Sequence, residues 1–226
     1  MKKKELSLRE IKFARTKLAL LDAALAQLPG KPFDEITLGE ICAAAEVSYA
    51  TFFNYFGKKS DLLFYFIQLW SIEVSHHARG IEKEAGGVKA IESIFQYTAR
   101  QCGKSPEIMG EIVSFLARRR EKDTSAIAPL TGAEKRLRFP DIDDFEGLAE
   151  MGLLSLFPGH IETAIRKGEL PPGTNVQEMV LALAVIFQGV PVTLGLAGAQ
   201  NYAAAYRHQL RLLWAGARAT LEEDLS

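Results

Sequence analysis

The stretch that decides the fold is Thr37 to Leu63, TLGEICAAAEVSYATFFNYFGKKSDLL. Its first part carries apolar side chains three and four residues apart, which is the pattern of a helix with one buried face. After a short interruption, Ser48 is a good N-cap for a second short helix, which Gly57 ends. We expect Ser60 to cap a longer third helix. Two short helices joined by a tight turn predict a helix-turn-helix, whose second helix fits the major groove of DNA.

The same residues resemble a known protein family. The run AEVSYATFFNYFGKKSDLL, residues 45–63, resembles the helix-turn-helix of TetR-type transcriptional regulators, and PFDEITLGEI, residues 32–41, resembles the entry to its first helix. The resemblance implies a dimeric repressor that binds double-stranded operator DNA. It also implies a three-helix DNA-binding domain over residues 1–63 and a larger helical domain for ligand binding and dimerisation over residues 64–226.

The second helix of the motif divides into two faces. Phe52 and Phe56 are four residues apart and should face inward. Asn54 is the best candidate for a hydrogen bond to a base, although it could instead only decorate the helix end. Phe53 stands where the family often has tyrosine, and Gly39 where some members carry a long side chain. The residues that the resemblance places on DNA are Thr37, Ser48, Tyr49, Ala50, Thr51, Asn54, Tyr55 and Lys59.

Charge is concentrated at the N-terminus. The whole chain of 226 residues has a net charge of −1 and 48% hydrophobic residues, so it is not uniformly basic. A basic arm before the motif would attract phosphate, whereas a merely solvated terminus is the alternative. Up to Leu20 the arm has a net charge of +5, from Lys2, Lys3, Lys4, Arg9, Lys12, Arg15 and Lys17 against Glu5 and Glu10.

The cysteines and the apolar segments bear on the compartment. Cys42 and Cys102 form no CxxC pair, which favours a reducing cytoplasm over a disulfide framework. The N-terminal lysines are not followed by an apolar stretch, so we expect no signal peptide. Residues 179–196 are long and apolar enough to raise the question of a membrane span. Gln188 and Pro191 interrupt this segment and no basic cluster flanks it, so we expect none.

The remaining pattern predicts an all-α protein. No segment shows the alternation of a strand. Residues 121–140 lack a steady period and contain proline and glycine, so we expect mostly loop there. The predicted helices outside the motif cover residues 9–28, 88–102, 106–120, 145–167, 176–197 and 202–221, together with the long helix from residue 60.

The sequence offers no pattern for catalysis, a cofactor or a metal. It contains no GxSxG, HExxH, GxGxxG or GxxxxGK[ST] motif. His76 and His77 are adjacent, and on a helix they point about 100° apart, which suits one metal ion poorly. The alternatives to a repressor are an activator, a nucleoid-associated protein that needs no ligand, and a helical enzyme or carrier with a borrowed DNA-binding domain.

Large and adaptable side chains gather in the middle of the chain, where we expect a cavity for a small effector of apolar or aromatic character. Aromatic residues at helical spacing are also typical of an ordinary core. The candidates are Tyr97, Met109, Phe115, Phe145, Met151, Phe157, His160 and Phe187.

One copy of so short a reading helix buries too little surface for operator specificity, so we expect a two-fold dimer with half-sites about 34–36 Å apart. The last two predicted helices are the expected pairing surface, and the alternative is that their apolar face packs within its own chain. The candidates are Met179, Leu183, Ile186, Val190, Leu194, Tyr206, Leu210, Leu213 and Trp214.

Overall fold

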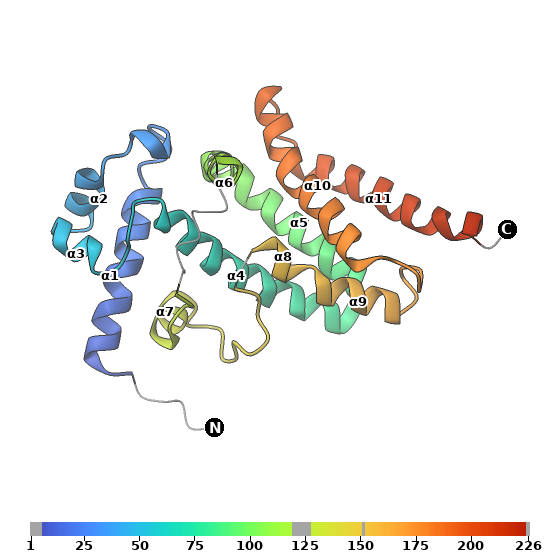
Figure 1. Ribbon diagram of the computed structural model, residues 1–226, viewed down its shortest axis with the longest axis horizontal. Helices are drawn as coiled ribbons and strands as arrows, with labels where there is room; N and C mark the ends of the chain where they lie inside the picture. Colours follow the sequence, from blue (N-terminus) through green and yellow to red (C-terminus); the bar gives the residue numbers. More distant parts are fainter. Residues whose placement is uncertain (1–5, 119–127, 151, 225–226) are drawn as a thin grey trace.

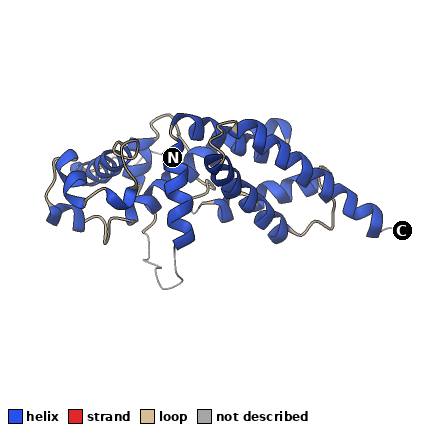
Figure 2. Ribbon diagram, turned by 90° about the horizontal axis from the view of Figure 1, so that it is seen from above, coloured by secondary structure: helices blue, strands red, loops and turns tan. Residues whose placement is uncertain are grey.

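The computed structural model describes residues 6–118, 128–150 and 152–224, and all the regular elements there are helical, as predicted. Figure 1 shows α1 to α3 gathered at one end, α10 and α11 at the other, and α4 running between them. Figure 2 gives the same arrangement from above. The elements are α1 (Leu8–Leu25), η1 (Phe33–Glu35), α2 (Leu38–Ala44), α3 (Tyr49–Phe53), α4 (Asp61–Ala85), α5 (Gly87–Lys104), α6 (Pro106–Arg118), α7 (Gly132–Arg138), α8 (Leu153–Leu156), α9 (Pro158–Arg166), α10 (Val176–Leu196) and α11 (Tyr202–Asp224).

Two hydrophobic cores share the long helix α4. We call the first the head core, and it holds the inward side chains of α1, α2, α3 and the first half of α4, from Leu62 to Ile72. Leu130 and Leu148, from beyond α6, also belong to it. The second core begins on α4 at Val74 and takes in α5, α9, α10 and α11. The head core therefore continues past residue 63.

Three expectations about local structure are wrong. Residues 121–140 were expected to be mostly loop, but residues 132–138 form α7, where Thr131 and Glu134 make a reciprocal capping box, and residues 121–127 lie outside the described ones. The predicted helix over residues 145–167 is two short ones, since Pro158 begins α9 as a new helix. Ser60 makes no side-chain cap, and Asp61 instead accepts a hydrogen bond of 3.0 Å from the Lys58 N–H.

Glycines 86 and 87 fix how α5 begins. Gly86 has a φ of 96°, a conformation that favours glycine. A Cβ on Gly87 would lie 2.1 Å from the carbonyl oxygen of His160, so only glycine lets α9 come this close. The carboxylate of Glu169 fills the space at the turn and accepts a 2.9 Å hydrogen bond from the Val88 N–H. The first turn of α5 is thereby held against α9.

A buried ion pair ties α1 to α7. Lys17 Nζ lies 2.6 Å from Glu134 Oε1, and the Glu134 side chain is 0% exposed. The ammonium also lies 4.3 Å from the ring centre of Tyr65 on α4. Burial alone would raise the pKa of Glu134, but hydrogen bonds from Lys17 and Thr131 bring that pKa below its usual value. Lys17 is thus a structural residue, and its assignment to the DNA-attracting arm is wrong.

We expect Lys17→Met to lower the free energy of unfolding by about 3–5 kcal/mol, because the substitution leaves a buried carboxylate without its partner. Urea unfolding at neutral pH measures this. Lys31→Met is the matched control, since Lys31 pairs with Glu40 at the surface, and it should cost about 1 kcal/mol or less.

The same ion pair gives the stability a dependence on pH. The pKa of Glu134 is lower in the folded chain, so its contribution is complete above the unfolded pKa of about 4.3 and is lost as the pH falls through the folded value. The acid destabilisation of the wild type should therefore exceed that of Glu134→Gln. Equal acid profiles for the two proteins would contradict the assignment.

Candidate nucleic-acid interface

The first helix of the motif, α2, begins with a capping box. The Thr37 hydroxyl accepts a 3.2 Å hydrogen bond from the Glu40 N–H, and Glu40 accepts one of 2.7 Å from the Thr37 N–H. Hydrogen bonds from Lys31 and Thr37 lower the pKa of Glu40 to about 2. The Thr37 hydroxyl donates its own hydrogen to Glu40 at 2.7 Å. A phosphate contact from this hydroxyl, as predicted, would therefore compete with the cap.

The second helix of the motif, α3, rests on aromatic side chains. Ser48 caps it and accepts a 3.1 Å hydrogen bond from the Thr51 N–H, as predicted. Phe52 and Phe56 are buried with ring centres 5.5 Å apart, which confirms that they face inward. The Phe56 ring in turn lies 5.6 Å from that of Tyr65 on α4. The orientation of α3 is thus set by packing against α4.

The outer face of α3 is open to solvent. Tyr49, Ala50 and Asn54 are exposed, as the predicted contacts with DNA require. The hydroxyl of Tyr49 lies 2.6 Å from where a Cβ on Gly39 would stand. Glycine at position 39 thus leaves room for the Tyr49 ring across α2, and this accounts for the absence of a long side chain there.

Two residues of this face are placed differently from the expectation. Phe53 is 56% exposed and lies four residues after Tyr49, on the same side of the helix. Sequence reasoning did not place it on DNA, although this spacing could have indicated it. Tyr55 is half-buried, with its ring 4.5 Å from that of Phe13 on α1. Its ring therefore helps to join α3 to α1, and only its outer part is open.

Lys59 has three partners inside the head. Its ammonium donates to the carbonyl oxygens of Phe33, Asp34 and Ile36 at 2.8, 3.0 and 2.6 Å. It also lies 4.9 Å from the ring centre of Phe33, and burial lowers the pKa of this lysine. All three donors of the ammonium are used, so Lys59 anchors the loop before α2. Its contact with phosphate stays a prediction.

The described part of the basic arm is α1. Arg9, Lys12 and Arg15 are exposed on it, and they leave the chain beside the motif positively charged. The three lysines at positions 2–4 lie outside the described residues. The arm therefore retains its cationic side without Lys17.

Comparison with known proteins bears on this head. The profile of a family described as "Bacterial regulatory proteins, tetR family" matches residues 20–66, which hold the motif and its platform. Over these residues the chain matches the TetR family of transcriptional regulators. No curated protein matches the chain in sequence.

Two solved structures of TetR-family proteins align with most of the chain. Thermus thermophilus FadR, a TetR-family transcriptional repressor in complex with lauroyl-CoA, matches at 19% identity with a TM-score of 0.64, over 87% of this chain and 92% of that one. A TetR-family regulator from Chloroflexus aurantiacus matches at 19% identity with a TM-score of 0.43, over 92% of this chain and 88% of that one. The first likeness extends the TetR fold to the helices after the head.

The side chains predicted to line one cavity lie in several separate places of this fold, so their shared cavity stays a prediction. Met109 lines a cleft of about 340 Å³ between α6, α10 and the start of α11. Met151 lies outside the described residues. Phe157 and Phe187 are buried in the second core, Phe115 and Phe145 pack on the head core, and Tyr97 donates a 2.5 Å hydrogen bond to Glu73 at the surface. His160 is buried with Nδ1 3.1 Å from Glu82 Oε2, and burial lowers its pKa.

The side chains predicted for the dimer interface lie mostly on the wrong face. The second core of the same chain buries six of them, so they are not available to a partner: Met179, Leu183, Val190, Tyr206, Leu210 and Trp214. Ile186, Leu194 and Leu213 are half-buried against that core. Among the described residues, the large apolar side chains that are exposed here are instead Leu181, Val185, Val192 and Leu196 on α10 and Leu212 on α11.

The composition of α10 explains the error. In the described part of the chain it is the one helix long and apolar enough to cross a membrane. Its inner face, which includes Leu183 and Phe187, packs into the second core like the core helix of a globular protein. Because the other face is apolar as well, the hydrophobic period does not single out one side.

We expect Lys59→Met to lower the free energy of unfolding by about 1–3 kcal/mol, because three carbonyl groups lose a charged donor. Lys12→Met, at an exposed position of α1, is the control and should change stability by about 0.5 kcal/mol or less. If Lys59→Met kept full stability but reduced the salt dependence of DNA binding by about one unit per subunit, the phosphate role would hold and the anchoring role would fail.

Proposed function

We propose that this TetR-family regulator is a dimeric repressor that occupies a palindromic operator in the cytoplasm and is released by a small-molecule effector. The observation that carries the DNA-binding part is the exposed outer face of α3, which rests on the buried Phe52 and Phe56 beside the cationic side of α1. Occupying an operator is sufficient to block transcription, and this requires no further chemistry from the protein.

Reading of the operator is assigned to four side chains. Asn54 carries the best hydrogen-bonding group, since an amide can bind an adenine edge through two hydrogen bonds. Tyr49 and Phe53 offer exposed aromatic rings, and the methyl group of Thr51 suits contact with a thymine methyl. Arg9, Lys12 and Arg15 would supply attraction to phosphate that does not depend on sequence.

Dimerisation is assigned to the outer face of α10 and to Leu212 of α11. Leu181 and Val185 are four residues apart and 65% and 63% exposed, and Val192 and Leu196 continue the same stripe. A second copy of the chain would remove this apolar patch from water. The two reading helices would then face one side of the operator together.

A small effector is the third part of the proposal. The related FadR structure contains lauroyl-CoA, which has a long apolar chain. That supports an effector with apolar character, as the sequence led us to expect. Binding of such a molecule would weaken operator binding only if it favours the arrangement of the dimer that fits DNA poorly.

The decisive experiment is a gel-shift titration with DNA flanking the gene of this protein. We expect a sequence-dependent shift, and Asn54→Ala should weaken it by about 1–3 kcal/mol with relaxed preference at one base pair in each half-site. Lys12→Ala is the contrasting variant, and it should weaken binding to all sequences alike. If no promoter DNA shifts at low salt, the proposed function is wrong.

The dimer surface can be tested separately. Val185→Glu should convert the dimer to a monomer, because it places a charge in the apolar stripe that the second copy would cover. Light scattering after size-exclusion chromatography gives the mass directly. Ala19→Glu introduces the same carboxylate at an exposed position of α1 and should leave the dimer intact. A dimeric Val185→Glu protein would exclude this face.

A further inference from the structure

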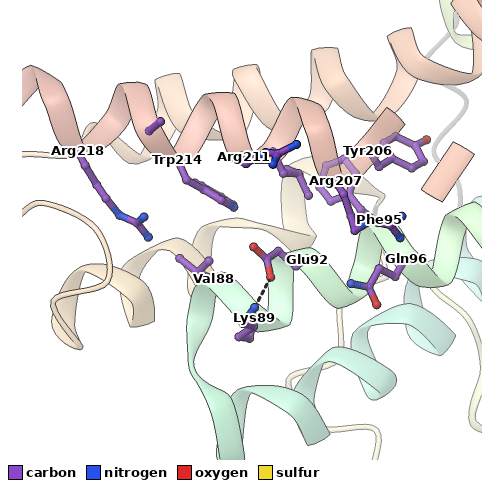
Figure 3. Close-up of a pocket in the computed structure, with 12 residues that line it drawn as sticks. Val88, Lys89, Glu92, Phe95, Gln96, Tyr206, Arg207, Arg211, Trp214 and Arg218 are labelled. Atoms are coloured by element: carbon purple, nitrogen blue, oxygen red, sulfur yellow. Dashed lines mark hydrogen bonds and ion pairs between the residues drawn. The ribbon is translucent and has the colours of Figure 1, made fainter. Parts of the chain in front are cut away.

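A cleft lies between α5 and α11 in the described part of the chain. It has a volume of about 670 Å³, within the usual range for sites that hold small organic molecules. Figure 3 shows it, with Trp214 and Arg218 extending from α11 toward Val88 and Glu92 on α5. None of the side chains predicted for the effector cavity lines this cleft.

The floor of the cleft is apolar and the rim is cationic. Phe95, Leu210 and Trp214 supply the floor, where the Phe95 side chain comes from the second core. Arg207 and Arg211 are four residues apart on α11 and therefore share one side of it, at the rim. An apolar floor beneath a charged rim suits a molecule that has an apolar body and a charged end.

The charge at the rim is not neutralised by the described side chains. No described carboxylate forms an ion pair with Arg207, Arg211 or Arg218. The one carboxylate in the lining, that of Glu92, lies 2.9 Å from the Lys89 ammonium and is used there. Guanidinium groups bind carboxylate and phosphate through paired hydrogen bonds, so they favour an anionic end.

Trp214 adds an independent observation. The residue is only 4% exposed, and its Nε1–H has no hydrogen-bond partner among the described residues. A buried indole N–H usually finds an acceptor, and leaving it without one is costly. Figure 3 places the indole nitrogen in the space between α11 and α5, where a bound molecule could accept its hydrogen bond.

We infer that this cleft binds an amphipathic anion, with its carboxylate or phosphate at Arg207 and Arg211 and its apolar body over Phe95, Leu210 and Trp214. A second copy of the chain fits less well, since a two-fold contact centred here would bring the arginines of both copies together. The exposed Leu212 follows Arg211 and points about 100° away from it, so a dimer built on Leu212 leaves the cleft open. The inference deepens the proposed function by assigning a class of effector, and only the release from DNA rests on that function.

Decanoate is a suitable probe, with decan-1-ol as its neutral counterpart and inorganic phosphate as the anionic end alone. The chain has two tryptophans, so Trp70→Phe leaves Trp214 as the only one to report by fluorescence. In this background we expect decanoate, below its micelle concentration, to change the Trp214 emission saturably. Decan-1-ol and phosphate should each bind at least about 10-fold more weakly, because each lacks half of the contacts.

Arg207→Gln combined with Arg211→Gln should weaken decanoate about 10-fold or more and leave decan-1-ol unchanged. Arg218→Gln is a second, single variant that should weaken decanoate in the same direction. The control is Arg100→Gln, at an exposed position of α5 outside the cleft, which should bind decanoate like the parent. Circular dichroism shows whether each variant is folded.

The inference would be overturned by equal binding of decanoate and decan-1-ol, or by unchanged decanoate binding in the folded double variant. Loss of quencher access to Trp214 with rising protein concentration alone would also overturn it. The last would mean that a second copy covers the cleft. Failure of decanoate to bind, with the gel shift intact, would contradict this inference alone. Loss of the gel shift, with decanoate binding retained, would contradict the proposed repressor alone.

Discussion

The arrangement of this chain depends on one helix that contributes to two hydrophobic cores. Leu62 and Ile72 of α4 lie in the head core, whereas Val74 and Ala78 of the same helix lie in the second core. A helix of 25 residues is about 37 Å long and is stiff over that length. Protein interiors are close-packed, so neither end of α4 can shift without repacking the core around it. The orientation of α3, which rests on α4 through Phe56 and Tyr65, is therefore linked to the second core.

The head has a second attachment, through Lys17 and Glu134. Removing two charges from water is expensive, and the pair repays this only through its short contact and the further hydrogen bonds from Thr131. The pair fixes the position of α7 relative to α1 and α4, because the Lys17 ammonium lies between Glu134 and the Tyr65 ring. The helix α7, which follows α6 in the chain, thus packs against α1 at the DNA-binding end. In the structure α7 belongs with α1, α2 and α3, although it lies far beyond residue 63 in the sequence.

The sequence predicts well where signals are local. Thr37 and Ser48 cap helices that begin at the next residue, and Phe52 and Phe56 face inward as their spacing requires. Prediction from the sequence fails where a residue far away in the sequence determines the role of a side chain. From the sequence, Lys17 belongs to a solvated basic arm, and only the folded chain places Glu134 beside it. The short helix α7 has a capping box as its only clear sequence signal. Residues of α10 are apolar on both faces, so their period could not separate Leu183, which is buried, from Val185, which is exposed. The cleft was not predicted because its lining residues on α5 and α11 are more than 100 positions apart in the sequence.

The two attachments of the head also constrain how an effector could act on it. α5 forms one wall of the cleft and packs along α4, so a change in the cleft can reach the head through α4. A hinge between the head and α7 would have to separate Lys17 from Glu134 and leave both charges buried without partners. A movement that keeps α1, α3 and α7 together avoids that cost and would change only the spacing of the two DNA-binding ends of the proposed dimer. Since binding energies at two sites are coupled reciprocally, an effector that favours one spacing must bind the DNA-bound dimer more weakly by the same free energy by which it weakens operator binding.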